Sequence, residues 1–209
     1  MLLETERARI VQHAGRLRPD GLVVGTAGNL SIRAGDLVAI TPTSVDYDEL
    51  DAGLICVVGM DGSIVEAERA PSSELAMHLG VYRATDAAAV VHTHAPYATT
   101  LAAVVDELPA VHYMIADLGG PVRVAPYATF GTDELAASVV DAFAGRSAVL
   151  LASHGTLTIG DSLEQAYWRS VLLEWLAALY YRSALLGAPR IIPAEELERV
   201  TDRLREIRG

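Results

Sequence analysis

Residues 88–95, AAVVHTHA, constrain the fold more than any other stretch because an apolar run ends there in two histidines one residue apart. Such a run predicts a buried strand over 90–94, in which alternate side chains share one face. His92 and His94 then project together, about 7 Å apart along the backbone. Two imidazoles on one face form part of a zinc site, and a catalytic zinc usually takes a third protein ligand and keeps one exchangeable position.

The length and composition predict one compact domain over 1–209. Hydrophobic residues make up 51% of the 209 residues, which is enough for a full core without disulfides. Cys56 is the only cysteine and lies in an apolar run, so we expect a buried thiol in a reducing cytoplasm. The N-terminus lacks the order of a signal peptide and no apolar stretch has the length of a membrane span, so we expect no membrane partner.

The charge pattern excludes other partners and one kind of catalysis. The net charge is −11, and no basic stripe appears, so we expect no nucleic-acid partner. All 16 basic residues are arginines. Schiff-base chemistry through a lysine amine is therefore excluded.

Hydrophobic periodicity, together with glycine and proline positions, predicts an alternation of helices and strands. Helices are expected at 2–18, from Ser72 or Ser73 through 82, at 96–104, 132–143, 163–186 and 194–207. Strands are expected at 30–33, 37–40, 54–58, 64–67, 90–94, 111–115, 122–125 and 148–152.

Small polar residues flank the hairpin expected at 30–40. Thr26 to Asn29 precede it and Thr41 to Ser44 follow it. Glycine lets backbone amides approach an anion, and threonine, asparagine and serine add neutral donors, so this segment is a candidate phosphate cradle. It matches neither the dinucleotide fingerprint nor the P-loop. An ordinary turn remains the alternative interpretation.

Further candidates lie at the ends of expected elements. Glu74 falls in the first turn of a helix, where stabilisation of the helix dipole is the competing interpretation. His78 shares its helical face and is either a rival ligand, a partner of Glu74 or a core residue. His154 follows the apolar run 148–152, and Tyr113 is either a proton donor or a packing residue.

These candidates can converge at one edge of a sheet. Three imidazoles and one carboxylate complete a tetrahedral zinc shell. With three neutral ligands, zinc keeps enough positive charge to polarise a carbonyl and stabilise an enediolate. A carboxylate displaced by substrate oxygens would lie beside the reacting carbon, ready to move a proton.

Seven segments then carry a family resemblance, namely GTAGNLSIR, ITPTS, PSSELAMH, AVVHTHAPYATT, HYMIA, APYATFGT and LLASHG. In order and spacing they resemble the class II aldolase and adducin family, over about 25–186. The resemblance implies an α/β fold with three α/β/α layers and a mostly antiparallel central sheet. It also implies a four-fold symmetric homotetramer with its sites between subunits.

The resemblance also implies roles for single residues. His92, His94 and His154 would bind Zn²⁺, with Glu74 as fourth ligand and acid/base. Tyr113 of a neighbouring subunit would handle the proton on the aldehyde-side oxygen. The substrate phosphate would be held by Thr26, Asn29, Thr43, Ser44, Ser72 and Ser73.

The sequence departs from the family pattern in two places. Ser44 stands where the family loop typically has glycine. The tail TDRLREIRG lacks a tyrosine that the fuculose-phosphate enzymes of the family place near the site. Aldehyde specificity is therefore left open.

The expected function is a zinc-dependent aldolase that reversibly cleaves a ketose 1-phosphate resembling L-fuculose 1-phosphate. The products would be dihydroxyacetone phosphate and a small aldehyde such as L-lactaldehyde. An L-ribulose-5-phosphate 4-epimerase and a methylthioribulose-1-phosphate dehydratase are alternatives on the same scaffold. A zinc hydrolase and a non-catalytic adducin-head-like interaction module are alternatives of other classes, and the intact Glu74 and histidine set argues against the module.

Overall fold

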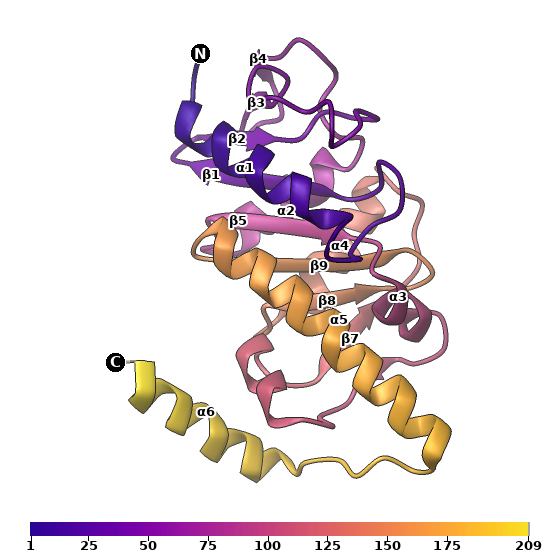
Figure 1. The fold of residues 1–209 in the computed structure, drawn as a ribbon. Helices are drawn as coiled ribbons and strands as arrows, with labels where there is room; N and C mark the ends of the chain where they lie inside the picture. The colour runs from indigo at the N-terminus through magenta and orange to yellow at the C-terminus, as the bar shows by residue number, and fades with distance from the viewer. Residues whose placement is uncertain (209) are drawn as a thin grey trace.

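A nine-stranded sheet runs through the computed structural model, which describes residues 1–208 (Figure 1). The strand order is β4-β3-β2-β1-β5-β9-β8-β7-β6. All neighbouring pairs are antiparallel except β7 and β8, which are parallel. The strands are β1 (Asn29–Ala34), β2 (Leu37–Ile40), β3 (Cys56–Gly59), β4 (Ile64–Glu66), β5 (Ala89–Thr93), β6 (Glu107–Leu108), β7 (Val122–Ala125), β8 (Ala148–Leu151) and β9 (Gly155–Gly160).

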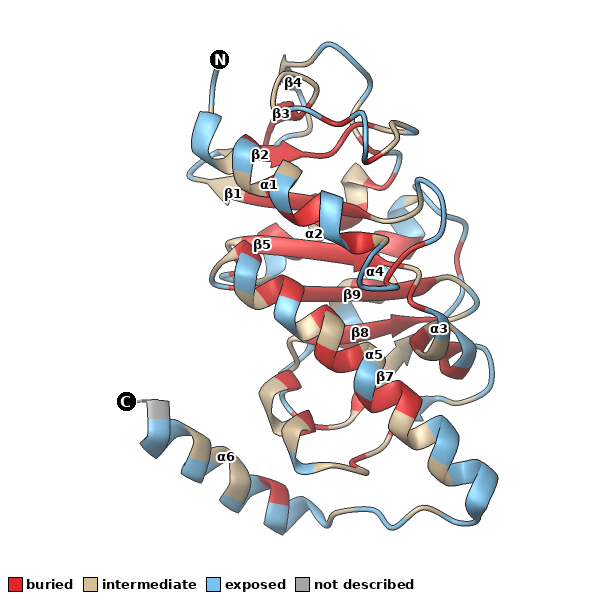
Figure 2. Ribbon diagram, in the orientation of Figure 1, coloured by how far each residue is buried: buried red, intermediate tan, exposed pale blue. Residues whose placement is uncertain are grey.

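Helices cover both faces of this sheet, which confirms the predicted three-layer α/β/α fold (Figures 1 and 2). One face carries α1 (Glu4–Leu17), α3 (Pro96–Ala102) and α5 (Leu163–Leu186). The other face carries α2 (Leu75–Ala84) and α4 (Asp133–Phe143). Within residues 1–208, no helix combines the length and the apolar character needed to cross a membrane.

Strand alternation divides the apolar side chains between two cores. On β1, Leu30 and Ile32 point toward α1 and α5, while Ser31 between them points to the opposite face. On β5, Val91 joins the first core and Val90 the second. Figure 2 shows the result, with the central strands buried along their length. The middle of the sheet is therefore the most rigid place on which to build a site.

The strand expected at 111–115 is wrong, because a 3-10 helix, η1 (Tyr113–Leu118), forms there. The His112 ring accepts a hydrogen bond from the backbone N–H of Met114 at 3.3 Å and so caps its start. Ile115 and Leu118 are both buried, a spacing of three that matches the 3-10 repeat. Tyr113 therefore lies on a helical turn and not in the sheet.

Two strands were not expected from the sequence. β6 contains only two residues, too few for a pattern. β9 has the sequence GTLTIG, in which glycine and threonine at alternate positions give only a weak apolar pattern.

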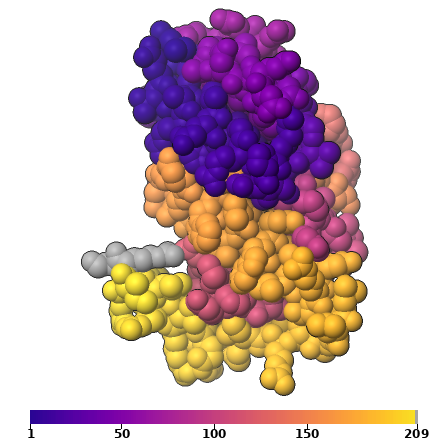
Figure 3. Space-filling model, viewed as in Figure 1, coloured from indigo at the N-terminus to yellow at the C-terminus, as the bar shows by residue number. Residues whose placement is uncertain are grey.

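The last helix, α6 (Ala194–Arg208), packs on η1. The space-filling view shows α6 at the end of the molecule opposite the first strands (Figure 3).

The start of α3 is held by a carboxylate from α5. The cap residue Ala95 has no side-chain oxygen to accept from the first backbone N–H groups of the helix. Glu174 replaces it, since its two carboxylate oxygens accept from the N–H groups of Tyr97 and Ala98, each at 2.9 Å. Because α3 begins directly after His94, this contact also fixes the end of β5.

We expect Glu174→Ala to lower the free energy of unfolding by about 1–2 kcal/mol, because it leaves two helix N–H groups without an acceptor. Glu164→Ala on the same helix is the matched control. Glu164 forms an exposed ion pair with Arg9, and such pairs contribute at most about 1 kcal/mol. Urea unfolding of both variants measures the difference, and equal losses would contradict the capping role.

Candidate metal centre and active site

His92 and His94 lie at the end of β5, at the centre of the sheet between β1 and β9. The Nε2 atoms of the two rings are 2.9 Å apart. The Nδ1 atom of His92 lies 2.8 Å from the carbonyl oxygen of Thr156 on β9. The predicted strand therefore places both imidazoles on one side, as the spacing indicates.

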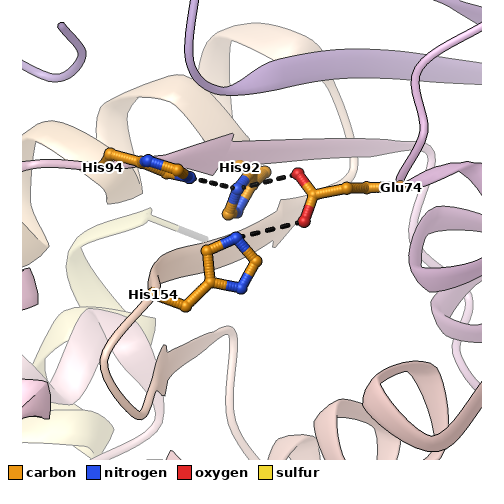
Figure 4. Close-up of side chains that lie close together, drawn as sticks. All are labelled: Glu74, His92, His94 and His154. Atoms are coloured by element: carbon orange, nitrogen blue, oxygen red, sulfur yellow. Dashed lines mark hydrogen bonds and ion pairs between the residues drawn. The ribbon is translucent and has the colours of Figure 1, made fainter. Parts of the chain in front are cut away.

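Glu74 and His154 complete the cluster (Figure 4). Glu74 occupies the N-cap position of α2 without a capping hydrogen bond from its side chain, and its carboxylate oxygens lie 3.0 Å from His92 Nε2 and 3.1 Å from His154 Nε2. One ligand atom from each of the four residues lies within 4.8 Å of the others. The structure thus brings together all four residues predicted as metal ligands.

The chemistry of this donor set fits a metal cation. The Thr156 carbonyl only accepts, so Nδ1 of His92 carries a proton and Nε2 is the ring atom that can offer a lone pair to a metal. That lone pair faces His94 Nε2 and a Glu74 oxygen. Electron pairs that converge in this way repel one another unless protons or a cation lie between them. Three imidazole nitrogens and one carboxylate form a set that zinc and similar divalent ions accept.

The electrostatics of the cluster keep His94 and Glu74 in the form that binds a metal. Burial, followed by the neighbouring His92 and His154 rings, lowers the pKa of His94 to about 4, so this ring is neutral at pH 7. Burial alone would raise the pKa of Glu74. Interactions with His92, His154 and Asn29 outweigh it and hold the pKa of this carboxyl well below its usual range. Glu74 is therefore ionised at neutral pH.

His154 reaches the cluster from the short connection between β8 and β9. Ser153 in this connection has a left-handed backbone, with φ of 52°. Gly155, which follows His154, lies against β5, and a Cβ atom there would stand 2.3 Å from the Thr93 carbonyl oxygen and 2.9 Å from the His94 ring. Only glycine lets β9 start this close to the two histidines of β5.

A pocket of about 320 Å³ opens beside the cluster, and Glu74, His94 and His154 line it. Its other lining residues are mostly small and polar. All six residues predicted to hold a phosphate are among them, namely Thr26, Asn29, Thr43, Ser44, Ser72 and Ser73. The structure thus places the predicted phosphate cradle next to the predicted metal ligands.

Sequence reasoning missed several residues of this pocket. Tyr127, Phe130 and Ser153 line it, and Tyr127 and Phe130 are exposed aromatic residues in a proline- and glycine-bounded loop. Aromatic residues in such a loop were the sequence signal that could have identified them as pocket residues. Tyr47 was missed because it does not line the pocket. It supports the pocket wall from behind, where its hydroxyl donates to the carbonyl oxygens of Ala27 and Gly28 at 2.8 and 2.9 Å.

Ser44 has a left-handed backbone with φ of 55°. This conformation costs roughly 1–2 kcal/mol for a residue with a Cβ atom and nothing comparable for glycine. The departure from the family pattern at this position therefore carries backbone strain. Ser44 and Ser153, both left-handed, line the same pocket.

Two candidates lie outside the cluster. His78 is fully buried one turn after Glu74, and its ring contacts Ser31 and Asn29 in place of the metal ligands. Tyr113 is 49% exposed on η1 and does not line the pocket. A role for Tyr113 at this site therefore requires a second subunit.

The sequence matches known proteins over nearly its whole length. The family model for the Class II Aldolase and Adducin N-terminal domain matches residues 8–181. A 5-deoxy-D-ribulose 1-phosphate aldolase from Bacillus thuringiensis is 42% identical over 206 residues, covering 97% of each chain. An L-fuculose phosphate aldolase from Escherichia coli is 39% identical over 188 residues, covering 88% of this chain and 87% of the other.

The fold agrees with these sequence matches. A solved structure of an L-fuculose 1-phosphate aldolase superposes with a TM-score of 0.94 and 40% sequence identity, covering 96% of each chain. The family match over residues 8–181 includes the positions of Glu74, His92, His94 and His154. The chain belongs to the class II aldolase and adducin family.

Proposed function

We propose that this class II aldolase reversibly cleaves a ketose 1-phosphate to dihydroxyacetone phosphate and a small aldehyde. The observation that carries the proposal is the Glu74 and histidine cluster opening into a pocket of neutral hydrogen-bond donors. A phosphate can bind there although the net charge is −11. Charges beyond a Debye length of about 8 Å are screened, so the local hydroxyl and amide groups decide.

Zn²⁺ is the metal we propose for the cluster, held by His92, His94, His154 and Glu74. Three imidazole nitrogens with one carboxylate oxygen suit its tetrahedral geometry. A bound zinc ion supplies positive charge that polarises the substrate carbonyl and stabilises negative charge on substrate oxygens.

Glu74 is the proposed acid/base. Cleavage passes the proton of the C4 hydroxyl, by way of Tyr113, to the ionised Glu74 carboxylate, breaks the C3–C4 bond and leaves the electron pair on the dihydroxyacetone phosphate fragment. Glu74 then gives this proton to C3 of that fragment, which leaves the carboxylate ionised again. The carboxylate lies where the pocket meets the histidines, and its pKa is held low, so it starts the cycle ionised.

Tyr113 is the proposed partner for the proton on the aldehyde-side oxygen. Because it lies away from the pocket of its own subunit, we propose that a neighbouring subunit of a homotetramer supplies it. Trp168 and Trp175 are exposed on α5, and Trp175 contacts His112 next to Tyr113, so this surface suits a subunit interface.

The candidate substrates differ in the aldehyde that their cleavage releases. Tyr127 and Phe130 add apolar surface to the pocket, which suits an aldehyde that ends in a methyl group. The Bacillus relative is an aldolase for 5-deoxy-D-ribulose 1-phosphate, whose cleavage releases acetaldehyde. The Escherichia relative points to L-fuculose 1-phosphate and L-lactaldehyde. We propose 5-deoxy-D-ribulose 1-phosphate as the better substrate because the tail lacks the tyrosine of the fuculose-phosphate enzymes.

The 4-epimerase and the dehydratase remain second candidates, since both would use the same metal and phosphate sites. An epimerase releases no fragments, and a dehydratase releases water. Product analysis separates all three. We place the enzyme in the cytoplasm, where its free, buried Cys56 would stay reduced.

We expect zinc-loaded protein to release dihydroxyacetone phosphate from both ketose 1-phosphates, and faster from 5-deoxy-D-ribulose 1-phosphate. A chelated sample should lose this activity and regain it on addition of zinc. A coupled assay for dihydroxyacetone phosphate measures the release. Full activity in the chelated sample would contradict the metal site, and fragment-free turnover would favour the epimerase.

We expect Glu74→Gln to lower kcat by about 10²–10⁴, because the amide neither accepts nor returns the proton. Bound zinc is measured on the same sample, so that loss of a ligand is separated from loss of the base. Glu49→Gln, at an exposed position away from the pocket, is the matched control. Wild-type turnover by a folded, zinc-bound Glu74→Gln variant would refute the acid/base role.

We expect subunit exchange to restore activity between Tyr113→Phe and Glu74→Gln, each of which is strongly impaired alone. In a randomly mixed cyclic tetramer, about a quarter of the sites receive an intact Glu74 and an intact Tyr113 from different subunits. The measurement is turnover after denaturation and joint refolding, with each variant refolded alone as control. If the jointly refolded mixture shows no more turnover than the separate variants, then either Glu74 and Tyr113 of one subunit form the site or Tyr113 has no role in it.

A further inference from the structure

A buried chain of hydrogen bonds leads from the interior of the protein to the carboxylate of Glu74. It runs from the Tyr82 hydroxyl to Ser31 Oγ at 2.7 Å, and from Ser31 Oγ to His78 Nδ1 at 2.7 Å. His78 Nε2 then contacts Asn29 Oδ1, and Asn29 Nδ2 donates to Glu74 Oε2 at 2.9 Å. His78 and Ser31 are fully buried, and the other three residues are at most 6% exposed.

The residues of this hydrogen-bonded chain come from helix α2 and strand β1, and their spacing on the two elements matches. Glu74, His78 and Tyr82 follow one another every four residues along α2, so they share one helical face. Asn29 and Ser31 are two residues apart on β1 and therefore share one face of the strand. Each strand residue bridges two successive helix residues, and only Asn29 and Glu74, at the end of the chain, reach the pocket.

The Glu74 carboxylate, at the end of the chain of hydrogen bonds, is the starting point for assigning the direction of each bond. An ionised carboxylate only accepts, so Asn29 presents its Nδ2 group to Glu74 and its Oδ1 to His78. Oδ1 also only accepts, so His78 carries its proton on Nε2. Burial lowers the pKa of His78 to about 3, so the ring is neutral and its Nδ1 accepts from Ser31. All donors therefore point toward Glu74.

We propose that His78 is a positioning residue, which holds the Asn29 amide in the one orientation that donates to Glu74. This inference rests on the acid/base role proposed for Glu74. A flipped amide would place Oδ1 against the carboxylate and Nδ2 against the Nε2–H group of His78, so both ends oppose the flip. Asn29 also lines the pocket, and His78 therefore acts on the reacting groups without touching substrate.

Two substitutions of His78 separate its two hydrogen bonds. The amide of His78→Gln reaches the place of Nε2 and donates to Asn29. The shorter amide of His78→Asn occupies the place of Nδ1, so it keeps the Ser31 contact and loses the donor to Asn29. Both variants remove a buried ring, so they carry a similar structural cost. Tyr82→Phe, at the far end of the chain, leaves the His78 contact with Asn29 intact and serves as a further control.

We expect His78→Asn to lower kcat about 10- to 100-fold, with a smaller change in KM, and to weaken zinc binding in a chelator competition. His78→Gln should recover at least about ten-fold of this loss, within the range that such supporting contacts carry. Tyr82→Phe should keep kcat while its unfolding midpoint falls. Equal losses of kcat and zinc affinity in His78→Asn and His78→Gln would overturn the proposal, and so would wild-type values in His78→Asn.

A measurement on the wild-type protein needs no variant to be active. In the histidine ¹⁵N spectrum, His78 should show a slowly exchanging proton on Nε2 and a bare Nδ1, with the signal assigned by its loss in His78→Gln. A proton on Nδ1 would overturn the proposal. If the wild-type protein releases no dihydroxyacetone phosphate, the proposed function fails, while the spectrum and the zinc competition still decide the role of His78.

Discussion

The pairing of β5 with β9 is the interaction on which the site depends. It joins His92 to Thr156 through the carbonyl that orients the imidazole, and its last pair, Thr93 with Thr156, lies next to Gly155, where an added Cβ atom would stand 2.3 Å from the Thr93 carbonyl oxygen. His154 stands just before this glycine and is carried to the other histidines by the same pairing. A side chain at position 155 would force the strands apart and separate the ligands. The metal site therefore depends on strand register for His92 and on the short β8–β9 connection, held at Gly155, for His154.

The site concentrates polar groups where the sheet is otherwise apolar. Glu74, His92 and His78 are buried, and burial of unpaired polar groups costs about 1–3 kcal/mol each. The cost is offset because nearly every group in this region has a partner of the correct kind. The Asn29 amide supplies two of these contacts, because its Nδ2 donates to the Glu74 carboxylate and its Oδ1 contacts the His78 ring. Such a network holds its members in one arrangement, which suits a site that must keep its geometry through a reaction.

The rim of the pocket contains two strained backbone positions. Ser44 and Ser153 adopt the left-handed conformation that glycine tolerates without cost, and both lie where the chain turns around the substrate space. The packed sheet beneath them supplies the stability that permits this strain. The pocket thus combines a rigid floor, built from strand ends, with walls built from strained turns and from the loop of Tyr127 and Phe130.

The sequence by itself determined most of the helices and strands and the ligand candidates, because periodicity and residue type are local properties. The three-layer arrangement of these elements was expected only through a family resemblance. The alternation around His92 and His94 predicted a buried strand with two imidazoles on one face, and helix signals placed Glu74 at the start of α2. The meeting of these residues was expected only through a family resemblance. Tertiary structure alone decided the strand order, the hidden strand β9, the 3-10 turn that carries Tyr113 and the link from His78 to Glu74 through Asn29. These features depend on contacts between residues far apart in the chain, and such contacts follow from how the elements pack, which no local pattern records.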